Sequence, residues 1–470
     1  MTEAVQVETS VATERLEHQR RERERRARLT SQLSIAARGA SYLSRLVVIP
    51  LSLKILGTER YGLWLAVGSL IAWLQMSDFG ISRGLVNVIA EATGREARQE
   101  VRRYISTGTV AFGVLSFAVA ILVVQLSRWQ GVPKLLNIQD AGLAQEAKIL
   151  VLICGLYFAA SLSLQGAAAV CEGLQEGYLG AGFQVFSALA NVAAASLLYW
   201  SGSGLTFFAL VMAAIPALAN AGLAFYIIAC RHPDLRPSYK EANWRSLKEI
   251  MRFGGPLMVL QMFTVAALYS MNLIIANRLG PAEVPKYSVP YSLFMTIAGV
   301  CYLLAHPYIP AYAEARRRGD WPWIRSRALR LLALTACLMG AGSVGLMVIG
   351  TPLIRWWAGV EVTPGTELLF WLGVYSVVNI AAATNGVLLI GIGRAAAKAV
   401  FHGISVSLMA VGAWLLLPIL GLVAIPLSGA CALLLDACLS LVYGLASAES
   451  QGRQGDCNPG PKRRAAMWRR

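Results

Sequence analysis

The chain has 470 residues, of which 56% are hydrophobic and only 14% are charged. Soluble domains carry roughly 25% charged residues, so this composition excludes a large soluble protein and indicates a membrane protein. The formal net charge of +16 could suggest nucleic acid as a partner, but the placement of the basic residues along the chain argues against that.

Apolar runs of about 20 residues recur along nearly the whole chain, and each is long enough to cross a bilayer as a helix. They predict an all-α polytopic membrane protein with about 12 transmembrane helices. The predicted spans, in chain order, are 31–56, 61–90, 104–126, 149–170, 178–200, 205–230, 250–276, 287–312, 328–349, 368–390, 400–417 and 421–445. Segment 350–367 has the least certain path, and part of it could be a short interfacial piece.

Basic residues are distributed unevenly between the two sides of the predicted membrane. If the N-terminus is inside, 31 of the 42 Lys and Arg residues fall in inner segments, eight in outer segments and three within spans. This bias is what the positive-inside rule predicts for cytoplasmic N- and C-termini.

The predicted spans divide the chain into two lobes of six helices. The charged stretch 13–32 predicts a helix, which either is solvated and fixes topology or contacts anionic lipid headgroups. The predicted parts are a basic cytoplasmic helix (1–30), an N-terminal lobe (31–230), a cytoplasmic linker (231–249), a C-terminal lobe (250–445) and a disordered basic cytoplasmic tail (446–470).

Short stretches of the first lobe match stretches of the second lobe, and the offset in residue number between the matching stretches is nearly constant. Leu56-Gly57 aligns with Leu279-Gly280 at an offset of 223 residues, and Gly173 aligns with Gly391 at an offset of 218. Two lobes of equal orientation imply a pseudo-twofold axis along the membrane normal, with the natural ligand site in the cleft between them.

Charged residues inside predicted spans are costly and therefore mark candidate sites. Arg38 and Arg45 lie on one face of the first span, and Arg83 lies in the second. These arginines, with His306 at the place equivalent to Arg83, predict a cationic cleft that holds a diphosphate through charge-assisted hydrogen bonds. Snorkelling to headgroups is the alternative for the two arginines of the first span, and a capped core histidine is the alternative for His306.

Three further polar residues in the spans have a coupling or a structural role. Asp78 is either hydrogen-bonded to another helix or a protonatable coupling site, while Asn87 continues the polar line of Arg83. Asp436, in the last span, either pairs or takes up a proton. Glu172 and Glu176 are expected at the inner interface, beside a predicted loop.

Seven of the eight cysteines lie in apolar runs, and no metal-ligand spacing occurs in the sequence.

The stretch LGTERYGLWLAVGSLIAWLQMSDFGISRGLVNVIAEATGREARQEVRRYISTG resembles the start of bacterial O-antigen repeat-unit flippases and polysaccharide exporters. These belong to the multidrug/oligosaccharidyl-lipid/polysaccharide (MOP) exporter superfamily. The resemblance implies a V-shaped pair of six-helix lobes with alternating access in the bacterial inner membrane. It also implies a lipid-linked oligosaccharide as cargo, with undecaprenyl diphosphate as carrier, and polysaccharide polymerase or assembly proteins as partners besides membrane lipids.

We therefore expect a non-enzymatic flippase for cell-surface polysaccharide biosynthesis, such as O-antigen, lipopolysaccharide or exopolysaccharide. An ion-coupled multidrug exporter of the same superfamily is the first alternative, and its cationic cargo would prefer an acidic cleft. A membrane polymerase or ligase of the same pathway is the second, and it would need catalytic residues on a large outer loop. No ATP-binding motif or other cofactor site is predicted, so the expected drive is an ion gradient or consumption of the product.

Overall fold

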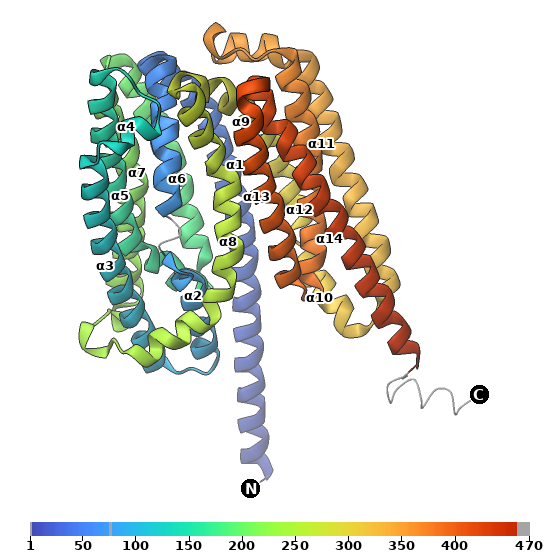
Figure 1. The fold of residues 1–470 in the computed structure, drawn as a ribbon. Helices are drawn as coiled ribbons and strands as arrows, with labels where there is room; N and C mark the ends of the chain where they lie inside the picture. The colour runs from blue at the N-terminus through green and yellow to red at the C-terminus, as the bar shows by residue number, and fades with distance from the viewer. Residues whose placement is uncertain (1, 75–77, 458–470) are drawn as a thin grey trace. The chain divides into compact units, whose positions relative to one another are not determined.

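A computed structural model describes residues 2–74 and 78–457 of the chain (Figure 1). Within these residues every regular element is helical and no strand occurs, which confirms the all-α prediction. The α-helices are α1 (Thr2–Trp73), α2 (Ile81–Gly94), α3 (Arg98–Arg128), α4 (Gly131–Leu135), α5 (Ala141–Gly173), α6 (Gly177–Ser201), α7 (Leu205–Phe225), α8 (Trp244–Leu279), α9 (Val284–Ala305), α10 (Tyr308–Arg318), α11 (Trp321–Trp357), α12 (Thr366–Gly391), α13 (Ala395–Leu420) and α14 (Ala424–Cys457). The shorter turns are η2 (Tyr226–Arg231), η3 (Pro233–Leu235), η4 (Tyr239–Glu241), η5 (Pro281–Glu283), η6 (Val360–Val362) and η7 (Gly421–Val423).

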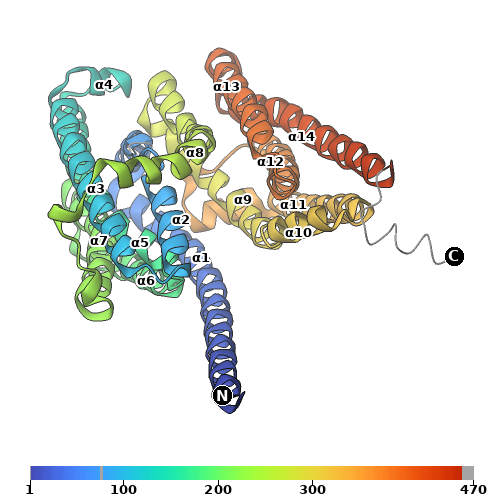
Figure 2. The same cartoon turned by 90° about the horizontal axis from the view of Figure 1, so that it is seen from below.

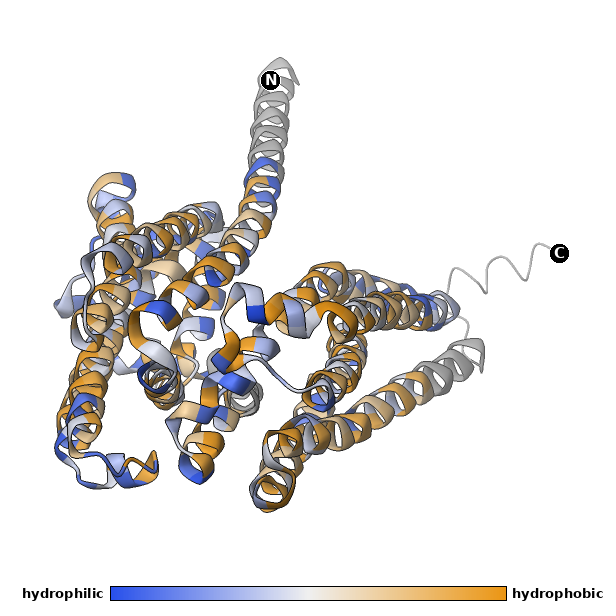
Figure 3. Ribbon diagram, turned by 90° about the horizontal axis from the view of Figure 1, so that it is seen from above, coloured by the Kyte–Doolittle hydropathy of each residue, from blue (hydrophilic) through white to orange (hydrophobic). Residues whose placement is uncertain are grey.

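The helices are apolar enough to form a multi-pass membrane protein. In the described part of the chain, nine helical segments are long and apolar enough to span a bilayer. One of them, Ala395–Ser447, contains the last two predicted spans, which η7 separates. Figure 3 shows that the coloured parts of α13 and α14 carry mostly hydrophobic residues, while hydrophilic residues gather where helices are joined.

The described residues pack into two compact units, each with its own core. Unit 1 comprises residues 1–57, 70–134 and 138–261, and unit 2 comprises residues 58–69, 135–137 and 262–470. In unit 1, α5 packs between α3 and α7, as Figure 1 shows. In unit 2, α14 packs against both α12 and α13, and α11 packs against α12 (Figure 2).

The internal repeat found in the sequence is present in the backbone of the two units. Gly57 breaks the helical path of α1 with φ 71° and ψ 173°, and its repeat partner Gly280 has φ 93° and ψ 164°. Both values lie in a region that L side chains rarely adopt, which explains why glycine occupies both positions. At the offset of 218, Gln175 and Gly393 also share a positive φ, of 59° and 77°.

The repeat also extends to the packing of helices. A Cβ atom added at Gly173 would lie 2.7 Å from Cγ2 of Ile89 and 3.2 Å from the carbonyl oxygen of Val86. A Cβ atom added at Gly391 would lie 2.6 Å from Cβ of Tyr312 and 3.0 Å from the carbonyl oxygen of Ile309. The offset of 223 maps Val86 to Ile309 and Ile89 to Tyr312, so each unit has the same close helix contact over a glycine.

This equivalence predicts matched effects in the two units. Gly173→Ala and Gly391→Ala should each lower the free energy of unfolding by about 1–3 kcal/mol, because a methyl group enters a filled contact. Thermal and chemical unfolding of the purified protein in detergent measures both. Gly113→Ala in α3 and Gly340→Ala in α11 are the controls, because an added Cβ meets nothing within 4 Å there. Equal stability of all four variants would contradict the assigned contacts.

Four sequence predictions about helix limits need correction. The span 287–312 is not one continuous helix, because α9 ends at Ala305 and α10 begins at Tyr308. The span 61–90 is not one continuous helix, because α1 ends at Trp73 and α2 begins at Ile81. The segment after residue 349 is not a separate interfacial piece, since α11 continues to Trp357 before η6. Helix α14 continues to Cys457, and the end of the predicted tail, 458–470, lies outside the described residues.

Candidate functional site

A buried ionic cluster lies where α13 packs against α14. Asp436 is fully buried, and its carboxylate accepts hydrogen bonds from Nζ of Lys398 at 2.7 and 2.8 Å. The hydroxyl of Ser440 donates to the same carboxylate at 2.9 Å, and Nδ1 of His402 lies 3.1 Å from its Oδ2. We call these four residues the Asp436 cluster. Lys398 and His402 are one turn apart on α13, and Asp436 and Ser440 are one turn apart on α14, so the hairpin brings them together.

Helix α12 completes the surroundings of this cluster. Nζ of Lys398 also donates to the carbonyl oxygen of Ala382 at 3.1 Å. A Cβ atom at Gly386 would lie 2.8 Å from Cε of Lys398, so the glycine leaves room for the lysine side chain. Beside it, Asn385 donates to the carbonyl oxygen of Ala437 at 2.9 Å and joins α12 to α14. The charged groups are thus held by three helices of unit 2.

Burying charges in a membrane-spanning region has a large desolvation cost. An ion pair offsets that cost only when its geometry is good and its remaining hydrogen-bonding groups are satisfied. The Asp436 cluster meets these conditions, yet an apolar pair of similar volume would be as stable or more stable. Ionisable residues retained inside membrane helices therefore point to function.

Unit 1 contains a second buried carboxylate, Glu176, in the turn between α5 and α6. Arg231 donates to it from Nη2 at 3.1 Å and from Nε at 3.3 Å. Nε2 of His232 lies 3.1 Å from its other oxygen, and Nη1 of Arg26 lies 3.7 Å away. These contacts join α1, the α5–α6 turn and the end of η2. Glu176 lies in a turn between two helices, as the sequence predicts, and it is buried there because basic groups from two other segments cover it.

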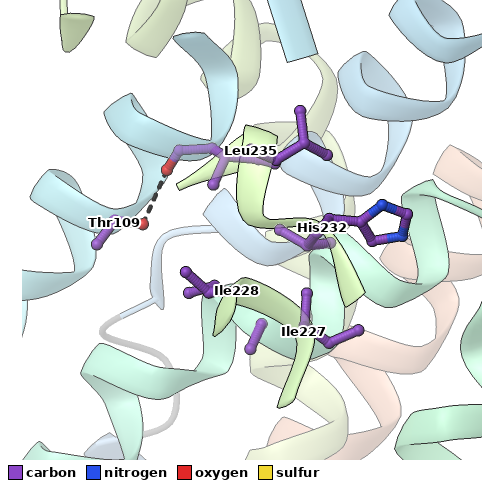
Figure 4. A pocket seen from close by; sticks show the side chains of 9 residues that line it. Thr109, Ile227, Ile228, His232 and Leu235 are labelled. Atoms are coloured by element: carbon purple, nitrogen blue, oxygen red, sulfur yellow. Dashed lines mark hydrogen bonds between the residues drawn. The ribbon is translucent and has the colours of Figure 1, made fainter. Parts of the chain in front are cut away.

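A small cavity lies next to His232 in unit 1 (Figure 4). It has a volume of about 20 Å³, and Thr109, Ile227, Ile228 and Leu235 are among the residues that line it. The imidazole of His232 points away from Thr109, whose hydroxyl instead donates to the carbonyl oxygen of Ile105 at 2.8 Å. A cavity of this volume holds about one water molecule, so it cannot be a site for a sugar.

The predicted cationic residues of unit 1 are exposed. Arg38 and Arg45 lie on α1, and Arg83 lies in the first turn of α2. The side chain of Arg83 is 62% exposed, and its Nη1 is 3.9 Å from Oε2 of Glu172, which is also exposed. Such a long, exposed ion pair contributes little to stability, so the guanidinium is available to another anion.

Asp78 has a local contact in the structure, and its coupling or structural role stays a prediction. It is buried in the break between α1 and α2, and it accepts a hydrogen bond from the backbone N–H of Gly80. That bond is local rather than across to another helix. Asn87 is on α2 and exposed.

His306 is exposed in unit 2, between the end of α9 and the start of α10. Its repeat partner Arg83 follows the helix break of unit 1, whereas His306 occupies the break of unit 2. The two residues are therefore equivalent in sequence position and differ in local backbone structure.

Sequence reasoning identified Asp436 but missed the residues around it. Lys398 was assigned to an inner loop, whereas it is a buried residue of α13. His402 was not considered, although its spacing of four from Lys398 places both on one helix face. The same spacing between Asp436 and Ser440 was a further signal that could have been used.

Comparison with known proteins places these observations in a family. A family model described as "Polysaccharide biosynthesis protein" matches residues 32–315, more than half of the chain. No curated protein sequence matches the chain at a significant level.

Several solved structures share the fold. The inward-facing conformation of a multidrug resistance MATE family transporter of the MOP superfamily matches with a TM-score of 0.73 and 14% identity, over 90% of this chain and 96% of that chain. The outward-facing conformation of a multidrug resistance MATE family transporter of the MOP superfamily matches with a TM-score of 0.61 and 13% identity, over 90% of this chain and 97% of that chain. A MOP superfamily transporter from Pyrococcus furiosus Vc1, described as having a binding pocket of reverse polarity, matches with a TM-score of 0.60 and 13% identity, over 91% and 96%. These likenesses confirm the MOP-type fold.

Proposed function

Since this chain belongs to the family of polysaccharide biosynthesis proteins, we propose that it moves a polyprenyl-diphosphate-linked oligosaccharide across the bacterial inner membrane. The family match carries the proposal, and the fold of a multi-pass MOP transporter supports it. In this proposal the protein acts by alternating access of its two halves, with both termini in the cytoplasm, and serves cell-surface polysaccharide biosynthesis.

The exposed arginines of unit 1 supply the chemistry that such a cargo needs. Arg38 and Arg45 are seven residues apart, so they share a face of α1 inside the spanning segment Arg28–Trp73. A guanidinium is costly next to hydrocarbon, and a diphosphate offers it two or more charge-assisted hydrogen bonds. The Pyrococcus furiosus transporter is described with a pocket of reverse polarity that suggests a different function, which supports relating the charge of a pocket to its cargo. We assign Arg38, Arg45, Arg83 and His306 to diphosphate binding on this basis.

The lipid profile of a deletion strain tests the cargo. We expect one lipid-linked oligosaccharide to accumulate with its sugars facing the cytoplasm, together with loss of the surface polysaccharide. Complementation with the full chain should reverse both changes. Unchanged glycolipids combined with altered drug tolerance would overturn the proposal in favour of a multidrug exporter.

Arg83→Ala tests the binding role directly. We expect this variant to insert and fold like the wild type but to lose at least nine-tenths of its transport, measured as surface polysaccharide in the complemented strain. Glu172→Gln is the matched control, because it breaks the same 3.9 Å ion pair but keeps the guanidinium. If both variants lost transport equally, the ion pair rather than phosphate binding would be the function of Arg83.

A further inference from the structure

The geometry of the Asp436 cluster points to a proton-binding site, and we propose that His402 takes up and releases the proton that drives transport. This inference rests on the proposed transport function and adds its energy source. Asp436 and Lys398 are positioning residues in this proposal, since they hold the imidazole and do not themselves exchange the proton.

The contacts of Asp436 determine which nitrogen of His402 is free. Both carboxylate oxygens lie within 2.8 Å of the Lys398 ammonium, so the carboxylate is held in its charged form and only accepts hydrogen bonds. Nδ1 of His402, 3.1 Å from Oδ2, must therefore carry a hydrogen. In the neutral ring Nε2 then has the lone pair, and this nitrogen is the one that can bind a further proton.

The residues of the Asp436 cluster differ in exposure, and the residue that we propose to exchange the proton, His402, is the more exposed one. The side chains of Asp436 and Lys398 are 0% and 8% exposed, whereas that of His402 is 18% exposed. Lys398 and Asp436 already neutralise each other, so charge balance does not require the histidine. A proton on Nε2 changes the cluster from neutral to positive.

The groups around His402 come from α8, α12, α14 and η7, which all contact α13. Helix α8 contributes the ring of Phe263, which lies next to Gly403, and its Arg278 lies with its guanidinium 3.7 Å from the ring of Trp414, farther along α13. Helix α14 contributes Asp436, Ser440 and Tyr443, and the ring of Tyr443 packs against Phe401, the neighbour of His402 in sequence. Arg394, just before α13, lies with its guanidinium 5.9 Å from the ring of Tyr443. Helix α12 contributes the carbonyl oxygen of Ala382, while its Glu367 lies near the other end of the helix. Turn η7, Gly421–Val423, has no titratable side chain.

The proposed step is a proton transfer alone, in which only the N–H bond at Nε2 of His402 forms and breaks. Nε2 accepts H⁺ from water on one side of the membrane, which converts imidazole to imidazolium, and it returns H⁺ to water on the other side after the conformational change. Because the added charge lies half-buried between α13 and α14, it alters the relative energies of their arrangements. A proton gradient can thereby favour one direction of transport.

Nitrogen-15 NMR of the full-length protein in lipid nanodiscs tests the site without any cargo. The chain has four histidines, and His402→Gln identifies the His402 signals by their loss. We expect a single neutral tautomer with hydrogen on Nδ1 at pH 9 and an imidazolium at pH 5. Asp436→Asn should allow both neutral tautomers, whereas Ser440→Ala, which leaves the contact to Oδ2, should not. A His402 ring that stays neutral throughout this range overturns the proposal.

A transport measurement completes the test. In the complemented strain, His402→Gln should reduce surface polysaccharide at least tenfold and remove its dependence on external pH between 6 and 8. Unchanged transport and pH dependence in this variant would overturn the coupling role. If His402 binds the proton in the NMR experiment but the deletion strain has unchanged glycolipids, the proton site stands and the oligosaccharide cargo is wrong.

Discussion

Lys398→Met is expected to lower the free energy of unfolding by about 3–5 kcal/mol, because it leaves the buried carboxylate of Asp436 without its cation. Methionine has a length similar to that of lysine, so the space beside Gly386 stays filled and the effect comes from charge. At pH 9, where the proposal has His402 neutral, His402 and Ser440 continue to contact Asp436, but neither supplies a positive charge. Unfolding of the purified protein in detergent, followed by tryptophan fluorescence, measures the loss.

The double variant Lys398→Met/Asp436→Leu is the control for this prediction. Removing both charges removes the desolvation cost together with the attraction, so its stability should return to within about 1 kcal/mol of the wild type. Its transport should stay impaired, because His402 loses the carboxylate that positions it. A double variant as unstable as the single variant would show that packing, rather than the unpaired charge, causes the loss.

Gly62→Ala is the second large expected effect. Gly62 lies in the part of α1 that belongs to unit 2, and an added Cβ would overlap the carbonyl oxygen of Pro281 and lie 3.0 Å from Cδ of Pro285. The carbonyl group of Pro281 belongs to η5, and the ring of Pro285 belongs to the first turn of α9. Neither group can move away from the added methyl group unless the backbone of that segment moves with it. We expect a loss of at least about 3 kcal/mol in unfolding free energy, at the upper end of overpacking effects.

Gly68→Ala supplies the matched comparison on the same helix. An added Cβ at Gly68 meets nothing within 4 Å, and alanine is favoured over glycine in a helix interior by about 1 kcal/mol. This variant should therefore be as stable as the wild type or more stable. Yield and unfolding midpoint in detergent compare the two variants, and similar losses in both would refute the close contact with Pro281.

The fold could be predicted from the sequence largely because membrane helices are defined by long apolar runs. The repeat was also visible, since glycines at close contacts and at positive φ, such as Gly57 and Gly280, cannot be replaced without strain. Helix limits were less predictable where polar and apolar residues alternate. The break before Ile81 depends on a turn at Phe79 and Gly80, which both have positive φ, inside a run that hydropathy alone joins together.

The polar clusters could be predicted only in part. Asp436 was identified because a carboxylate in an apolar run is conspicuous, but Lys398 is at a helix start, where charge counting treats a lysine as part of a loop. Its partner is 38 residues away in sequence, so nothing local reveals the pair. The burial of Glu176 could not be predicted for the same reason, since Arg231 reaches it from 55 residues away.

The two units share backbone features at matching positions, but the Lys398–Asp436 ion pair of unit 2 has no counterpart at the matching positions of unit 1. At an offset of 217 or 218, Lys398 corresponds to Ala181 or Gly180, and Asp436 corresponds to Ala219 or Leu218. One copy of a duplicated fold thus carries an internal ion pair where the other copy carries only small or aliphatic residues. Exchange of these positions between the two units should not be neutral, because the residues that accommodate a buried ion pair in one unit are absent at the matching positions of the other.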